Sequence, residues 1–448
     1  MILIGNDRLK TEDFLSFDFA WENAAKAKGP ELQATWASLS IKVGSTVVTE
    51  FVDKRSKSLR SALYLPLYPL AEWIADNWWF LAAEVDRVGK PALQFERRHN
   101  IRYAREGFAL PSLTITKIGE CTRLAWNKYE LSNPDILFNQ EGDCLLKAAS
   151  VRQSLYDFVE AVITRLLESG ISDTPLQEQW AGIQETDEEE IHFCETVARL
   201  GVDPYAIDNR EAGAVVLKAS KIRPELVDDF FSLVDSSNFE VEIDQLNEAA
   251  NTVANDDTAD DSFSGIKKLA PRLSPMQTPW ETGYEYASML RKTLGTGMLR
   301  TTTFDDMAKN LQINNPSMAI IERTSSVGKM IDAVIGVNKK RKTRILLNKQ
   351  LPASKKFVFC RALFDYLTLP EGSFSVISKL KNEQQQMNRA FAAEILVPHQ
   401  MLKEDLMSSV IDDEEVDSLA EFYSVSSYVI RHQIKNHRLA RLERSYSK

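Results

Sequence analysis

The sequence predicts a multidomain α+β protein with a sheet-containing N-terminal domain, a helical middle and a mixed C-terminal domain. A chain of 448 residues is longer than one ordinary domain. Apolar residues alternate in several N-terminal segments, whereas later segments follow the helical period. The polar, acidic stretch 251–264 is typical of a linker. We therefore expect domains over 1–168, 169–250 and 270–448, with an acidic linker over 251–269.

The composition is that of a soluble globular protein, with 44% hydrophobic and 26% charged residues. A net charge of −10 argues against a chain that is basic throughout for nucleic-acid binding. The four cysteines form no CxxC pair, which disfavours metal fingers and a disulfide framework and is typical of a reducing cytoplasm. We expect no signal peptide, and no apolar stretch approaches the roughly 18 residues of a membrane span, so no membrane partner is expected.

The N-terminal domain is expected to combine several strands with two helices. Strands are predicted in four segments: a hairpin over 33–52, and single strands over 58–65, 110–117 and 122–129. Helices are predicted over 69–84 and 144–167. The first helix carries Trp73, Trp78 and Trp79, which we expect to form core, although exposed tryptophans also mark binding surfaces.

The rest of the chain is expected to be mostly helical around a small sheet. Residues 187–201 begin with acidic residues and end in glycine, as helices do, and two or three further helices follow before 250. The C-terminal helices are predicted at 280–294, 305–311, 355–366, 382–396, 416–422 and 426–436. Strands are predicted over 318–322, 330–337 and 343–347.

Residues 355–367 come close to a zinc-binding helix without carrying its chemistry. A His-Glu-x-x-His helix places two zinc ligands one turn apart, with a glutamate base beside them. Here the five positions read Arg361-Ala362-Leu363-Phe364-Asp365. Arg361 cannot ligate zinc, because a guanidinium is a permanent cation without a lone pair to offer. Ala362 cannot take a proton from a metal-bound water.

Four further segments occur in the order typical of one protein family. They are the helix that opens at Pro279, the strand 344–348, the segment Phe391-Ala-Ala-Glu-Ile-Leu-Val-Pro398 and the terminal helix pair 416–436. With these segments the C-terminal part, about 40% of the 448 residues, resembles the ImmA/IrrE family of metallopeptidase-like domains. The resemblance implies a zincin-like fold whose members cleave repressors or act as stress sensors, often on mobile elements or in phage-response loci.

The resemblance also implies that the active site is degenerate. The two histidine ligands of the family fall on Arg361 and Asp365, and its glutamate base falls on Ala362. The third ligand, a glutamate ahead of the Phe-Ala-Ala segment, corresponds to Glu383 only with a shift in register of about two residues. We expect Arg361 and Asp365 to form an ion pair in place of the metal, with Glu383 as a further partner. A new ligand or peptide pocket at the former cleft is an alternative.

These observations favour a non-catalytic function. We expect a cytoplasmic bacterial regulatory or scaffolding protein that recognises a protein partner, with no cofactor. The alternative is a metal-dependent endopeptidase that holds zinc through unusual ligands, namely Asp365, Glu383 and His399. The partner, the oligomeric state and the role of residues 1–170 stay open.

A third hypothesis is that the last two helices bind DNA. A helix-turn-helix with a basic second helix can enter the major groove. Arg431, Lys435 and Arg438 supply positive charge on or directly after the second helix. Ile430 and Ile434 are spaced as core residues, however, which indicates a packing unit. The basic run from 339 to 344 we interpret as a solvated loop rather than a phosphate contact.

Overall fold

The computed structural model describes residues 14–23, 27–86, 92–104, 107–132, 135–234, 239–254, 263–274, 276, 278–296, 300–313, 320–322, 331–337, 343–348 and 352–443. The chain is mixed α+β and divides into two units, Met1–Gly213 and Ala214–Lys448, each with its own hydrophobic core. The start of the chain up to residue 13, the middle of the predicted linker (255–262) and residues 339–342 of the basic run lie outside the described residues.

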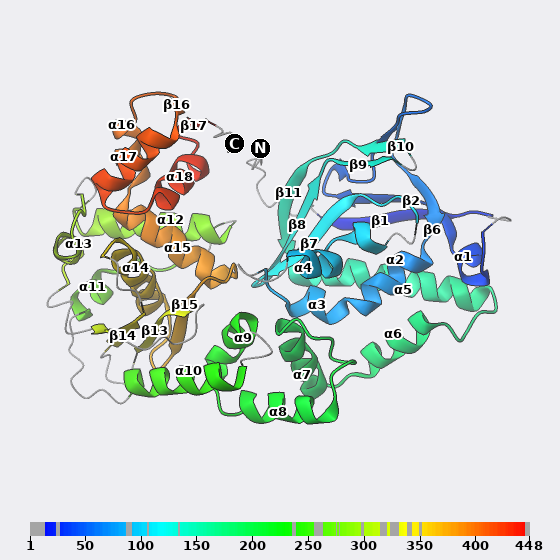
Figure 1. The fold of residues 1–448 in the computed structure, drawn as a ribbon, viewed down its shortest axis with the longest axis horizontal. Coiled ribbons are helices and arrows are strands. Elements are labelled where there is room, and N and C mark those ends of the chain that lie inside the picture. The colour runs from blue at the N-terminus through cyan, green and yellow to red at the C-terminus, as the bar shows by residue number, and fades with distance from the viewer. Residues whose placement is uncertain are drawn as a thin grey trace. The chain divides into compact units, whose positions relative to one another are not determined.

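The described part of the N-terminal unit contains three antiparallel sheets (Figure 1). The first joins β1 (Leu15–Trp21), β2 (Trp36–Val43), β3 (Thr46–Val47) and β6 (Leu63–Pro66). The second joins β5 (Ser58–Arg60), β4 (Phe51–Asp53), β10 (Asp135–Phe138) and β9 (Tyr129–Ser132), and the third joins β11 (Gly142–Lys147), β8 (Cys121–Asn127) and β7 (Ser112–Ile118). The β2–β3 hairpin and the β7–β8 pair confirm two predictions. The segment 58–65, expected as one strand, contributes to two sheets because the chain bends at Ser61.

Helices cover these sheets and complete the core. They are α1 (Pro30–Ala34), α2 (Tyr68–Asp76), α3 (Trp78–Ala83), α4 (Ala92–His99), α5 (Ala148–Glu168), α6 (Pro175–Glu185), α7 (Glu188–Arg199) and α8 (Asn209–Ala219), the last of which spans the boundary between units. The single helix predicted over 69–84 is interrupted at Asn77, whose side chain donates to the Trp73 carbonyl at 2.8 Å. Trp73, Trp78 and Trp79 are buried, which confirms their place in the core.

The unit boundaries differ from the predicted ones because helices of the middle segment pack on both units. In the N-terminal unit, Trp180 on α6 meets Trp78 edge to face, with ring centroids 5.0 Å apart, so this unit extends beyond residue 168. In the C-terminal unit, Val253 near the end of α10 (Phe239–Ala254) lies against β13 (Ile331–Val337) so closely that a Cβ on Gly336 would meet it at 2.7 Å. The expected independent helical domain over 169–250 is therefore divided between the two units.

The C-terminal unit surrounds a four-stranded sheet with helices. The sheet order is β12 (Ile320–Glu322), β14 (Thr343–Leu347), β13 and β15 (Phe374–Ser378), and only the β12–β14 pair is parallel within it. The helices are α9 (Pro224–Leu233), α10, α11 (Ser264–Leu269), α12 (Pro279–Thr293), α13 (Phe304–Asn310), α14 (Pro352–Thr368), α15 (Glu383–Leu396), α16 (His399–Asp405), α17 (Asp413–Tyr423) and α18 (Ser427–Asn436). α10 and α14 pack against β13 and β14, and α12 packs along α15. The predicted linker 251–269 is thus helical at both described ends.

The end of the chain forms the predicted pair of short helices. α17 and α18 are joined by a turn in which Ser424 adopts a left-handed conformation, with φ of 51°. A short parallel ladder between β16 (Val410–Ile411) and β17 (Arg441–Leu442) holds the segment before α17 beside the segment after α18.

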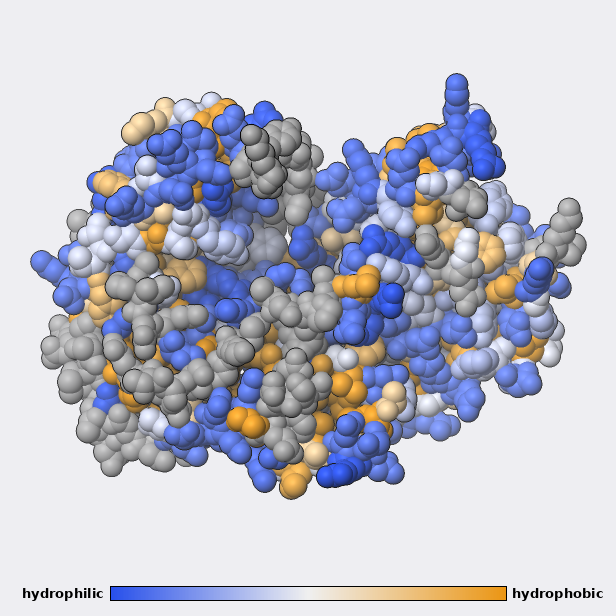
Figure 2. Space-filling view, viewed as in Figure 1, coloured by the Kyte–Doolittle hydropathy of each residue, from blue (hydrophilic) through white to orange (hydrophobic). Residues whose placement is uncertain are grey.

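Across the part of the chain that the structure describes, no helix combines the length and the hydropathy needed to cross a membrane. On the face drawn in Figure 2, hydrophilic side chains cover most of the coloured surface, and hydrophobic ones form small separate areas. The four cysteines are free thiols.

Candidate functional site

The residues of the degenerate motif lie on α14, on the side that faces α15 and the sheet. Ala362 is fully buried, Asp365 is fully buried, and Arg361 retains 3% of its surface. Apolar neighbours on the same helix, Phe359 and Leu363, fill the hydrophobic core of the unit. The motif positions are therefore part of the interior of the unit rather than of a surface loop.

Arg361 is bound by three residues that follow it in the chain and by one that precedes it. Its Nε donates to Asn388 Oδ1 at 2.8 Å. Its Nη2 donates to the Ser378 carbonyl at 2.8 Å and to Gln385 Oε1 at 2.6 Å. Its Nη1 lies 3.6 Å from Asp332 Oδ2, which forms its ion pair. The guanidinium thereby joins α14 to α15, β15 and β13, the arrangement that a buried cation requires to offset its lost hydration.

Asp365 has its own set of partners. Its Oδ2 accepts from the Ser375 hydroxyl at 2.6 Å, and its Oδ1 accepts from Gln384 at 2.7 Å and from Asn388 Nδ2 at 3.3 Å. The predicted direct ion pair between Arg361 and Asp365 is therefore wrong, because Arg361 forms its ion pair with Asp332 instead. One turn of helix separates the two residues, and the amide of Asn388 lies between them and bonds to both.

Burial changes the protonation of the charged groups in this network. Desolvation raises the pKa of Asp365 to about 6, although hydrogen bonds from Ser375 and other neighbours oppose the shift. It raises the pKa of Asp229, on α9, to about 7, with the charge of Asp365 adding to the effect. Desolvation and the nearby Arg389 lower the pKa of Arg361 to about 9. Asp229 accepts from Asn382 Nδ2 at 2.6 Å, which connects α9 to the start of α15.

The structure brings Gln385, rather than Glu383, to Arg361. The Gln385 side chain is fully buried, accepts from the Ser378 amide at 3.0 Å and donates to the Val376 carbonyl at 2.6 Å. Glu383 is the first residue of α15, and neither it nor Asp365 belongs to a group of three potential metal ligands among the described residues. A glutamine amide bound to a guanidinium leaves no carboxylate for a metal at this point. Gln385, the residue that contacts Arg361, lies two positions after Glu383 in the sequence.

A second polar cluster lies at the other end of α15. Glu394 Oε1 lies 2.7 Å from His399 Nδ1, at the start of α16, and Oε2 lies 3.6 Å from His437 Nε2, after α18. The two imidazole rings stack with centroids 4.3 Å apart. The hydrogen bond with Glu394 raises the pKa of His399, whereas burial lowers the pKa of His437 to about 4. Spacing along the chain carries no signal for this cluster, because His399 begins α16 and His437 follows α18.

The basic residues of the terminal pair are not grouped on one free surface. Arg431 Nη2 lies 2.5 Å from Asp413 Oδ1, in the acidic first turn of α17. Lys435 and Arg438 are exposed, the latter just beyond the end of α18. The predicted core positions on α18, including Ile430 and Ile434, are buried. The positive charge that the DNA hypothesis requires is thus partly neutralised by α17.

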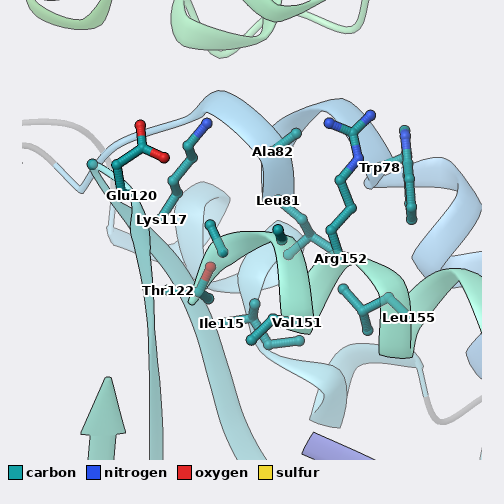
Figure 3. A pocket seen from close by; sticks show the side chains of 13 residues that line it. Trp78, Leu81, Ala82, Ile115, Lys117, Glu120, Thr122, Val151, Arg152 and Leu155 are labelled. Atoms are coloured by element: carbon teal, nitrogen blue, oxygen red, sulfur yellow. The ribbon is translucent and has the colours of Figure 1, made fainter. Parts of the chain in front are cut away.

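The N-terminal unit contains a pocket of about 240 Å³ above α5. Figure 3 shows Lys117, Glu120 and Arg152 around its opening, with Ile115 and Val151 at its base. The guanidinium of Arg152 lies over the Trp78 ring, with 5.1 Å to the centroid. Both signs of charge are present at the opening, so the pocket has no single complementary charge for a ligand.

A buried ion network in the same unit involves Arg98 and His99. Glu84, fully buried, accepts from Arg98 Nε at 2.8 Å and lies 3.2 Å from His99 Nε2. The other ring nitrogen of His99 lies 2.8 Å from the Ile115 carbonyl. Because both nitrogens of the imidazole are occupied, this network stabilises the core and leaves no atom for acid or base chemistry.

Comparison with known proteins gave no family model, no curated protein and no solved structure that matches this chain. The resemblance to ImmA/IrrE domains stays a prediction that rests on the segments quoted above and on the order in which they occur.

Proposed function

We propose that this chain is a non-catalytic regulatory or scaffolding protein that recognises another protein through its degenerate ImmA/IrrE-like unit. The observation that supports this most is the buried guanidinium of Arg361, held by three hydrogen bonds and one ion pair at the position of a family metal ligand. A guanidinium cannot bind zinc, and Ala362 cannot activate water. Recognition without cleavage is the function compatible with both residues.

The resemblance also suggests the setting. Members of the family that cleave repressors or sense stress are found on mobile elements and in phage-response loci. A chain that retained recognition and lost cleavage would act there by binding a regulator, in the bacterial cytoplasm. We propose no cofactor at the site around Arg361.

The terminal helix pair offers side chains suited to a protein partner. Phe422 on α17 and Tyr428 on α18 are 47% and 63% exposed. Aromatic side chains are enriched at the energetic centres of protein interfaces. We propose that these two residues contribute to partner binding, and that the acidic face of α17 favours a basic surface on the partner.

A proteolysis assay tests the loss of catalysis. The purified full chain is incubated with Zn²⁺, Mn²⁺ or Fe²⁺ and with unstructured protein substrates, and no metal-dependent cleavage is expected. Cleavage that requires metal and disappears in Asp365→Ala would contradict the proposal and support the atypical peptidase. That alternative has less support, because Ser375, Gln384 and Asn388 already occupy the Asp365 carboxylate.

Partner recognition is tested by crosslinking in cells followed by mass spectrometry. Tyr428→Ala and Phe422→Ala should reduce recovery of a specific partner. Tyr64→Ala should not, because Tyr64 lies in the N-terminal unit, and its exposed fraction of 55% falls between those of the other two. Equal recovery with all three variants would remove the terminal pair from the proposal.

The DNA hypothesis makes a separate prediction. Steeply salt-dependent binding to duplex DNA, weakened in Arg431→Ala and Lys435→Ala, would support it. The pairing of Arg431 with Asp413 leads us to expect no binding even at low salt.

A further inference from the structure

Three potential metal ligands converge where α15, α16 and α18 meet. One side-chain oxygen or nitrogen from each of Glu394, His399 and His437 lies within 4.8 Å of the other two. Within the described ranges of the chain, no other set of three or more His, Cys, Asp or Glu side chains has this geometry. We infer that Glu394, His399 and His437 form a binding site for a divalent transition metal ion of the zinc class.

The donor set matches the chemistry of such an ion. Two imidazoles and one carboxylate are a ligand set that zinc uses in proteins, with the remaining positions left to water. Metal–ligand distances of about 2.0 to 2.1 Å place tetrahedral ligands about 3.3 Å from one another. The two separations from Glu394, 2.7 Å to His399 Nδ1 and 3.6 Å to His437 Nε2, lie on either side of that value. The two separations are to different oxygens of Glu394, Oε1 and Oε2, and the His399 ring would have to rotate for both imidazoles to point at one ion.

His437 provides an independent observation. Its Nε2 is buried and forms no hydrogen bond with the residues that the structure describes. Buried polar atoms nearly always have a partner, because an unpaired one costs free energy. The ring is fixed between the His399 imidazole, at 4.3 Å, and the Tyr284 ring, at 4.5 Å between centroids. A metal ion bound to Nε2 would supply the missing partner, and the His399 ring would turn out of its stack to share the ion, because two parallel rings do not direct their lone pairs at one point.

The surroundings hold the ligands and leave access from solvent. Gln433 donates to Glu394 Oε2 at 2.9 Å and to the Val397 carbonyl at 2.6 Å, which orients the carboxylate as outer-sphere partners do. The side chains of Glu394, His437 and His399 are 3%, 17% and 31% exposed. The exposed fraction thus rises from the carboxylate outward, which gives an ion a path to the site and room for water ligands.

This site is separate from the degenerate motif, because it uses none of the residues around Arg361. An ion bound here would join α15 to α16 and α18, and so fix the terminal helix pair on the rest of the unit. Its predicted effect is on the stability of that pair and not on hydrolysis.

Metal binding by the full chain tests the inference. The protein is freed of metal with a chelator, then titrated with Zn²⁺ against a competing chelator dye. We expect one ion per chain, with affinity lowered at least about tenfold in His437→Phe, the loss typical of even an outer-sphere ligand partner. Phenylalanine keeps an aromatic ring beside His399 and removes the ring nitrogens, Nε2 among them.

Two variants serve as controls. His432→Phe changes another histidine on α18 that is outside the cluster, and Asp365→Ala changes the degenerate motif, so both should bind Zn²⁺ as the unaltered chain does. Loss of binding in Asp365→Ala alone would overturn this inference and the proposed function together. Absence of binding in the unaltered chain, or full binding in His437→Phe, would overturn only the inference.

Co²⁺ gives a readout that needs no variant. Bound by two imidazoles and a carboxylate in low coordination, Co²⁺ should show intense visible absorption bands, which Zn²⁺ then abolishes by displacement. Circular dichroism checks the folding of each variant. If His437→Phe unfolds, His399→Ala, at the more exposed ligand, carries the test. If the unaltered chain shows no more than the weak bands of hydrated Co²⁺, the inference is overturned.

Discussion

Asn388 bonds to Arg361 through its oxygen and to Asp365 through its nitrogen, at 2.8 Å and 3.3 Å. A neutral amide thus stands between a cation and a carboxylate that lie one helical turn apart on α14. The Asn388 oxygen accepts from the guanidinium of Arg361, and the Asn388 nitrogen donates to the carboxylate of Asp365. One neutral side chain therefore pairs with both charged groups. The polar network in this interior consequently depends on Arg361 being present and charged.

Replacing Arg361 by methionine should strongly destabilise the C-terminal unit. The change leaves Asp332, Gln385 and Asn388 without the group that their side chains face, in a position where water cannot replace it. We expect a loss of about 3–5 kcal/mol in the free energy of unfolding, measured by urea denaturation. Arg300→Met is the control, because Arg300 pairs with Asp405 at 2.8 Å but is 45% exposed, and should cost less than about 1 kcal/mol. Similar losses in both variants would contradict this account.

The half-buried carboxyl of Asp229 should make stability depend on pH. Its pKa of about 7 in the folded chain exceeds the ordinary value of 3.8, because of burial and the nearby Asp365. The folded chain therefore holds a proton that the unfolded chain releases above about pH 4. The stability contribution is complete below that pH and is lost as pH rises through about 7.

Asp229→Asn carries no such proton and keeps an oxygen to accept from Asn382. Its free energy of unfolding should exceed that of the unaltered chain by about 1–2 kcal/mol at pH 8, a discounted value because Asp229 is partly exposed. The difference should vanish near pH 4 in scanning calorimetry. Asp244→Asn, an exposed change on α10, should show no such trend. A difference independent of pH would refute the proposed protonation.

Glu84 should be essential to the core of the N-terminal unit. Burial alone would raise its pKa, but hydrogen bonds from His99 and Arg98 hold the pKa of Glu84 below its ordinary value. Glu84→Gln removes the charge that both partners face, and should cost about 3 kcal/mol in thermal or urea unfolding. Glu96→Gln, which breaks the more exposed pair with Arg102, should cost less than about 1 kcal/mol.

Local signals in the sequence identified most elements of the fold. Errors arose where the structure of a segment depends on the strand with which it pairs. Thr278 and Glu281 form a capping box at the start of α12, a signal contained in the sequence itself. Residues 144–147, expected at the start of a helix, form β11 instead, because they pair with β8. Their apolar residues fit either period, and nothing local distinguishes the two.

The site was predictable in its residue types but not in its contacts. The unusual Arg361 and Asp365 were evident from the motif, whereas their link through Asn388 depends on the packing of α14 against α15. Likewise, His437 meets Glu394 only because α18 folds back on α15. Spacing along the chain carries no information on such encounters, since tertiary packing alone creates them.

The close approach of α12 to α15 should depend on Gly283. A Cβ at this position would lie 2.2 Å from the Met387 carbonyl oxygen and 2.9 Å from the Ala390 Cβ, which is too close for either atom. Gly283→Ala must therefore separate the two helices, with an expected cost of about 1–3 kcal/mol or more, as for other overpacked cores. Gly182→Ala is the matched control, because Gly182 also lies within a helix, α6, but a Cβ there meets no atom within 4 Å. That change should raise stability by about 0.5–1 kcal/mol, the usual gain of alanine over glycine in a helix. Melting temperatures that shift in opposite directions would support the close packing of α12 on α15, and equal shifts would exclude it.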